Sequence, residues 1–161
     1  MKVRILGIGN PILKDDAIGI EVAKYLECKN IVGVEIREVE SGGMDLLEEF
    51  RGCDIAIVVD SIVTCNHEPG SIIEMTLNEL PFTRRLRGAH DADLNSALHL
   101  AKAIGMDLPE KVSVLAIEVS DNSTFGYGMT PEVEKAVVSA AEKALSLAFA
   151  ELKKVSDQDW R

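Results

Sequence analysis

The chain has 161 residues, of which 47% are hydrophobic and 27% are charged, and its formal net charge at pH 7 is −10. This length predicts one domain over residues 1–161, and the acidic balance disfavours nucleic acid and anionic membranes as partners. Cys28, Cys53 and Cys65 are odd in number and form no CxxC pair, which excludes a disulfide framework and a cysteine-rich zinc module. Because no stretch approaches the ~20 apolar residues of a membrane-spanning helix, we expect a cytoplasmic protein.

Strands and helices are predicted to alternate along the chain. In order, they are strand 2–8, helix 16–27, strand 33–39, helix 44–51, strand 54–59, strand 71–76, helix 92–104, strand 112–119 and a long helix from 131, before a frayed tail at 156–161. Asp15 or Asp16 can cap the first helix, and Thr130 can cap the last, with Pro131 at its first position. This order is typical of a three-layer α/β/α domain.

The ends of two predicted strands carry the acidic residues of greatest interest. The run 54–59 is almost wholly apolar, as in a central parallel strand buried on both faces, and it ends at Asp60. The first strand leads into GNPILKDD, which contains Asp15 and Asp16. Ligands of open parallel sheets bind beyond the carboxyl ends of the strands. If the first and third strands are neighbours, these carboxylates converge at one edge.

The glycines after the first strand allow a second interpretation. Gly7 and Gly9 match the start of a GxGxxG dinucleotide-binding pattern. However, Ile12 stands where the third glycine belongs, and Pro11 removes a backbone donor that would face a phosphate. A tight exit from the strand explains the same glycines.

Histidine and cysteine side chains suggest two possible metal sites. Asp60, Cys65 and His67 could hold a soft metal, although their spacing matches no zinc template. His90 lies just before a predicted helix, where it is either a capping or surface residue or a ligand that completes a site with Asp16 and Asp60. The chain has no HExxH or GxSxG motif, which disfavours a zincin and a serine hydrolase.

Five motifs in order give the chain a family resemblance. They are GIGNPILKDDAIG at 7–19, VVDS at 58–61, EPG at 68–70, HDADL at 90–94 and GMTPEVE at 128–134. Together they resemble the nickel–iron hydrogenase maturation endopeptidases, over nearly the whole chain. These enzymes remove a C-terminal extension from the hydrogenase large-subunit precursor after nickel insertion. The resemblance implies a twisted, mostly parallel five-stranded sheet flanked by helices.

The resemblance also implies a metal-reading site. Its ligands are Asp16, where some members have Glu, with Asp60 and His90, and the metal is the nickel that the substrate presents. Two carboxylates and one imidazole suit Ni²⁺ and leave coordination positions open. We expect the metal to orient the scissile peptide and polarise its carbonyl while Asp16 or Asp60, as catalytic residues, assist proton transfer. The expected partner is the large-subunit precursor.

Two further groups of residues are candidates for substrate binding. Arg84, Arg85 and Arg87 lie close together in the sequence and could bind the backbone or carboxylates of the precursor. A solvated basic patch explains them equally well. Gly42 and Gly43 would allow close approach of the precursor, and an ordinary turn explains them as well. We expect a monomer, because no heptad pattern or apolar interface stripe occurs.

The alternative from another class is a non-enzymatic α/β domain, either receiver-like or small-ligand-binding. A phosphoacceptor receiver also uses paired acids after the first strand and an acid ending the third, here Asp15, Asp16 and Asp60. The last strand is followed by Ser120 and Asp121, without the Lys-Pro that a receiver would carry. The receiver pattern also assigns no role to the histidine before the third helix.

Overall fold

The strands are β1 (Val3–Ile8), β2 (Val34–Val39), β3 (Ile55–Ile62), β4 (Ile72–Thr76) and β5 (Lys111–Glu118). The computed structural model describes residues 1–40, 42, 45–79 and 94–156. Its strands form one five-stranded sheet in the order β2-β1-β3-β5-β4. β2, β1, β3 and β5 are parallel, and β4 pairs antiparallel with β5. The predicted mostly parallel sheet is confirmed, and the first and third strands are neighbours, as the convergence hypothesis requires.

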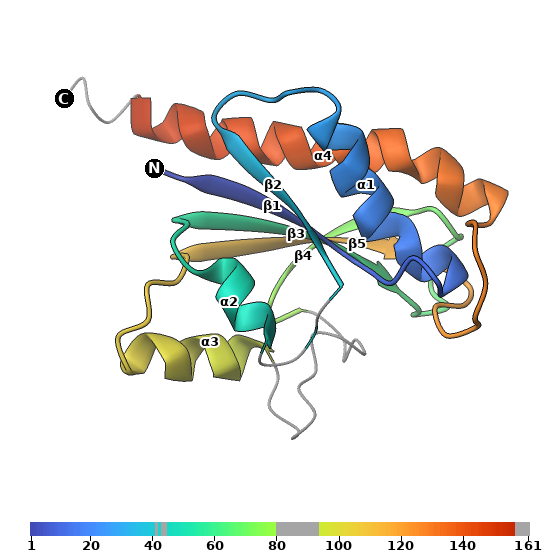
Figure 1. Ribbon diagram of the computed structural model, residues 1–161, viewed down its shortest axis with the longest axis horizontal. Coiled ribbons are helices and arrows are strands. Elements are labelled where there is room, and N and C mark those ends of the chain that lie inside the picture. Colours follow the sequence, from blue (N-terminus) through green and yellow to red (C-terminus); the bar gives the residue numbers. More distant parts are fainter. Residues whose placement is uncertain (41, 43–44, 80–93, 157–161) are drawn as a thin grey trace.

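Helices cover both faces of this sheet (Figure 1). On one face lie α1 (Ile18–Glu27) and α4 (Pro131–Ser156), and on the other lie α2 (Leu46–Phe50) and α3 (Leu94–Ala103). Alternating side chains of the central strands supply the two apolar cores. Ile5 and Ile57 pack with α1 and α4, whereas Leu6 and Val58 pack with α2 and α3. The three-layer α/β/α architecture expected from the element order is confirmed.

The strand that carries Asp60 is longer than its apolar run predicts. We expected the strand to end at Asp60, but the ladder with β5 continues through Asp60, Ser61 and Ile62. All eight residues of β3 are buried. Asp60 therefore sits inside a paired strand whose backbone is fixed on both sides of it.

The entry to α1 also differs from the expectation. Asp15 and Asp16 lie in a 3₁₀ turn, η1 (Lys14–Ala17), and neither side chain caps this turn or α1. The first turn of α1 lies directly against the sheet, since a Cβ added to Gly19 would overlap the carbonyl oxygens of Ile8 and Val59. A Cβ on Gly9 would likewise overlap the carbonyl oxygen of Asp16. A Cβ on Gly7 would overlap the carbonyl oxygen of Gly19, so both glycines of the partial dinucleotide pattern serve close packing and need no phosphate to explain them.

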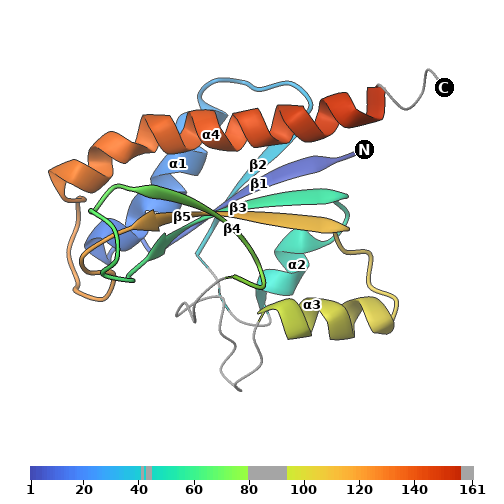
Figure 2. The same cartoon turned by 180° about the vertical axis from the view of Figure 1, so that it is seen from behind.

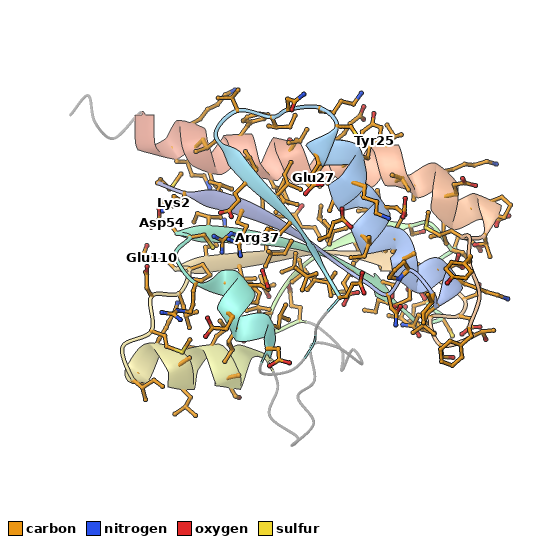
Figure 3. The ribbon with its side chains drawn as sticks, viewed as in Figure 1. Lys2, Tyr25, Glu27, Arg37, Asp54 and Glu110 are labelled. Carbon is orange, nitrogen blue, oxygen red and sulfur yellow. The ribbon has the colours of Figure 1, made fainter. Side chains whose placement is uncertain are left out.

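Both ends of the described chain lie at the edge of the sheet where the parallel strands begin, opposite the carboxyl ends of these strands. Figures 1 and 2 show the start of β1 and the last turn of α4 on the side where the parallel strands begin. Lys2, Asp54 and Glu110 lie on this side too (Figure 3). The Lys2 backbone N–H donates to the Asp54 carboxylate at 2.6 Å, and the Glu110 N–H donates to the Asp54 carbonyl at 2.9 Å. The carboxyl ends of β1 and β3 lie at the far edge.

Within the described residues, no helix combines the length and apolar character that a membrane crossing requires. The cytoplasmic location and the monomeric state stay predictions.

Candidate functional site

Ser61 joins the two carboxylates that the sequence placed at the carboxyl-end edge. Its hydroxyl donates to Asp16 Oδ1 at 2.7 Å, and its backbone N–H donates to Asp60 Oδ1 at 2.8 Å. Asp16 is 4% exposed and Asp60 is 3% exposed. Asp16 therefore bonds the residue that follows Asp60 in β3, through a serine that sequence reasoning did not single out.

Asn122 extends this arrangement from the loop that follows β5. Its side-chain Nδ2 donates to Ser61 Oγ at 3.4 Å, while the same hydroxyl donates its proton to Asp16. The hydroxyl thus has a fixed direction, because one partner takes its proton and the other uses its lone pair. The only sequence signal for this contact is the polar composition of SDNSTFGYGM, which does not say which residue faces β3.

Asp15 points to a different partner from that of Asp16. Its Oδ1 accepts the backbone N–H of Thr130 at 2.6 Å, and its Oδ2 accepts the Thr130 hydroxyl at 2.9 Å. α4 begins at Pro131 as predicted, with Thr130 directly before it. The Asp15 carboxylate therefore ties η1 to the start of α4, which gives this 2%-exposed acid a structural role.

The loop between β5 and α4 pairs with the loop that carries Asp16. The Lys14 N–H donates to the Gly126 carbonyl at 2.9 Å, and the Gly126 N–H donates to the Ile12 carbonyl at 2.9 Å. Asp121 orders the start of the same loop by accepting the Ser123 N–H at 2.8 Å. Hydrogen bonds from Thr124 and Ser123 hold the pKa of Asp121 far below its ordinary value. Two segments of distant sequence thus form one ordered rim beside the carboxylates.

Glu118 fixes the loop after β3 from inside the fold. Its Oε1 accepts the backbone N–H groups of Thr64 at 2.7 Å and Cys65 at 2.9 Å, and its Oε2 accepts the Thr64 hydroxyl at 2.6 Å. Burial opposes the charge of this 2%-exposed side chain, but these hydrogen bonds and the electrostatic interaction with His67 lower its pKa. Sequence reasoning treated Glu118 as an ordinary strand residue and missed this role.

Several predicted site residues lie outside the described part of the chain. These are the metal-ligand candidate His90 and the substrate-binding candidates Gly43, Arg84 and Arg85, together with Arg87. Gly42 is described and half-buried. Across residues 1–40, 42, 45–79 and 94–156, no group of three or more His, Cys, Asp or Glu side chains could hold a metal. The soft-metal hypothesis for Asp60, Cys65 and His67 is therefore wrong.

The described part of the site contains two buried carboxylates, those of Asp16 and Asp60, near the carboxyl end of β3. Carboxylate oxygens can ligate a divalent cation or exchange a proton with a reacting group. The backbone of Asp60 is held by pairing with β5, and that of Asp16 lies in η1, which contacts β3 and Gly9. Such fixed geometry suits recognition of a metal or a scissile peptide.

Comparisons with known proteins agree on one family. Residues 20–147 match the family model described as "Hydrogenase maturation protease". The Hydrogenase 2 maturation protease of Escherichia coli (strain K12) is 30% identical over 150 residues, covering 91% of this chain and 90% of that protein. The solved hydrogenase maturating endopeptidase HybD from E. coli aligns with a TM-score of 0.74 at 26% identity, over 94% of each chain. A solution structure of an endopeptidase from Escherichia coli aligns with a TM-score of 0.73 at 30% identity, over 91% of each chain.

Proposed function

The chain belongs to the hydrogenase maturation protease family, and we propose that it removes the C-terminal extension of a nickel–iron hydrogenase large-subunit precursor after nickel insertion. It is thus a hydrogenase maturation endopeptidase, as its motifs indicated. The non-enzymatic receiver alternative, which needed Asp15 beside Asp16 and Asp60, has no support from these relatives. The pair of buried carboxylates joined by Ser61 is the observation that carries the proposal.

In this proposal Asp16 and Asp60 read the nickel that the precursor already holds. Carboxylate oxygens and an imidazole nitrogen form a borderline-to-hard donor set, which Ni²⁺ accepts. His90 supplies the imidazole, on the strength of the family resemblance. In this proposal nickel is presented by the substrate, and other divalent metals can substitute for it.

The carboxylates also take part in the cleavage itself. The nickel that the precursor presents would orient the scissile peptide and polarise its carbonyl. Asp16 or Asp60 then accepts a proton from the attacking water and returns a proton to the leaving amine. The hydrogen bonds that Ser61 donates to Asp16 and to Asp60 would hold the two carboxylates in position during these transfers. Gly42, Gly43, Arg84 and Arg85 stay candidates for contacts with the precursor backbone.

A cleavage assay with the cognate precursor tests the proposal. Purified enzyme is mixed with precursor that carries nickel or lacks it, and the mass of the precursor is followed. We expect loss of the C-terminal extension only from the nickel-loaded form. Asp16→Asn, Asp60→Asn and His90→Ala should each lower the cleavage rate by at least about a hundredfold, the order of a lost acid–base group.

The matched control is Asp107→Asn, which changes an exposed aspartate and should cleave at the wild-type rate. Cleavage of nickel-free precursor at the same rate would refute the nickel-reading role while leaving the peptidase. Normal rates for both aspartate variants would refute the catalytic role. No cleavage of a verified nickel-loaded cognate precursor would refute the proposed function as a whole.

A further inference from the structure

Two aromatic side chains stand out from the rim of the site. Phe125 is 76% exposed and Tyr127 is 85% exposed, although aromatic residues make up only 4% of the chain. Exposed large aromatic side chains lose the free energy that burial would give, and they are enriched at protein interfaces. Their presence on one short loop therefore calls for a partner that covers them.

The backbone beneath these side chains is ordered. Gly126, which lies between them, is paired with Ile12 and Lys14 by two backbone hydrogen bonds of 2.9 Å. The φ angle of Gly126 is +157°, and a Cβ there would press on the Lys14 side chain at 2.9 Å. A glycine at this position lets the two loops lie in contact. The aromatic side chains are thus held out from a fixed backbone, which lowers the entropy lost on binding.

This surface continues directly into the proposed active site. Ile12 is 39% exposed and lies four residues before Asp16 on the loop that pairs with Gly126. Asn122, on the aromatic loop, donates to the Ser61 hydroxyl that bonds Asp16. A folded protein that delivers its C-terminal peptide to Asp16 would therefore lie next to this rim.

We propose that Ile12, Phe125 and Tyr127 form a docking surface for an apolar patch of the precursor beside its C-terminal extension. This inference rests on the proposed function. Aromatic side chains that become fully covered commonly dominate binding energy at interfaces. The docking surface supplies affinity for the folded precursor, whereas the carboxylates act on the nickel and the peptide. Its loss should therefore appear in KM, with kcat retained.

Steady-state cleavage of nickel-loaded precursor by the Phe125→Ser/Tyr127→Ser double variant tests this surface. We expect KM to rise about tenfold or more, with kcat within about twofold of wild type. Tyr127→Phe should retain the wild-type KM, because the proposed contact with the precursor is made by the aromatic ring and not by the hydroxyl. Val32→Ser is the matched control, since Val32 is 90% exposed and precedes β2 at the opposite edge. Thermal unfolding of each variant confirms that the fold is kept.

Three outcomes would overturn the docking surface. The first is a double variant whose KM stays within about twofold of wild type or changes no more than that of Val32→Ser. The second is a fall in kcat alone, which would mean that the loop supports Asp16 and does not dock the precursor. The third is a wild-type dimer in sedimentation that the double variant loses, which would assign the patch to a second copy. Failure of wild-type enzyme to cleave is a separate result, because it refutes the proposed function and the docking surface falls with it.

Discussion

Replacing Glu118 by Gln should lower the free energy of unfolding by about 2 kcal/mol at pH 7. Hydrogen bonds to a charged group contribute about 1.5–3 kcal/mol and neutral ones about 0.5–1.5 kcal/mol, so each bond weakens by about 1 kcal/mol. The amide oxygen of Gln can keep the two backbone N–H groups that Glu118 Oε1 accepts, from Thr64 and Cys65. The amide nitrogen can donate to the Thr64 hydroxyl, which reverses its direction. All three bonds thus lose their charge assistance, about 3 kcal/mol in total, and relief of the burial cost of the carboxylate offsets part of this loss.

Glu118→Ala removes the acceptor altogether and should cost more. The Thr64 hydroxyl and the two backbone N–H groups then lack their carboxylate acceptor. An unsatisfied buried donor costs about 1–3 kcal/mol, so a total of about 4 kcal/mol or more is expected. Cys65 adds to this, because its φ of +60° is a left-handed conformation that the hydrogen bond to Glu118 helps to hold.

The pH dependence of the Gln variant separates charge from shape. The pKa of Glu118 in the folded protein is lowered from 4.5, so its charge stabilises the fold above that value. This stabilisation is lost as the pH falls through the lowered folded-state pKa. Urea unfolding at pH 7 and at progressively more acidic pH should therefore show the deficit of Glu118→Gln shrinking toward zero.

The control is Glu142→Gln on the exposed side of α4, which should change the unfolding free energy by less than about 0.5 kcal/mol at either pH. Equal stability of wild type and Glu118→Gln at pH 7 would refute the reasoning. So would a deficit that does not depend on pH.

Three further predictions concern packing and reactivity. Gly19→Ala should destabilise the fold by about 1–3 kcal/mol or prevent folding, because its Cβ would overlap backbone oxygens of β1 and β3, and unchanged thermal unfolding would contradict this. Asp15→Ala should lower the free energy of unfolding, measured in urea, by about 1–3 kcal/mol and leave kcat unchanged, because both hydrogen bonds from Thr130 are lost. A variant that is stable but inactive would instead place Asp15 in the active site. A thiol reagent should modify Cys28 and Cys65 in the native protein and all three cysteines after unfolding, because Cys53 is buried and burial raises its pKa. Rapid labelling of Cys53 in the native protein would refute that packing.

The sheet could be predicted from its pattern of apolar runs, but the exact end of β3 could not. A wholly apolar run such as 54–59 is typical of a strand covered on both faces, and β3 is indeed central. Asp60 and Ser61 interrupt that run, and polar residues at the end of an apolar run normally mark a turn. They stay in the strand because β5 continues opposite them to Glu118. This depends on the partner strand, which the local sequence does not encode.

The candidate site was predictable to the extent that topology alone positions it. Asp16 follows β1 and Asp60 lies near the carboxyl end of the neighbouring strand β3, so the strand order alone brings both to one edge of the sheet. The contacts of Ser61 with Asp16 and of Glu118 with Thr64 span 45 and 54 residues, and nothing in the local pattern indicates them. Asp15 and Asp16 could not be told apart, since neighbouring residues of a 3₁₀ turn point about 120° from each other and either could face the sheet.

The position of the chain ends has a practical consequence. The start of β1 and the end of α4 lie on the side of the sheet opposite Asp16 and Asp60. An affinity tag or carrier protein joined to either end would therefore project away from an incoming precursor. The enzyme can be immobilised on a sensor surface through either end with the proposed docking surface turned to solution. A precursor fused to either end would need a linker that reaches the opposite edge of the sheet. That linker must span at least the length of β1, which is about 20 Å for six residues.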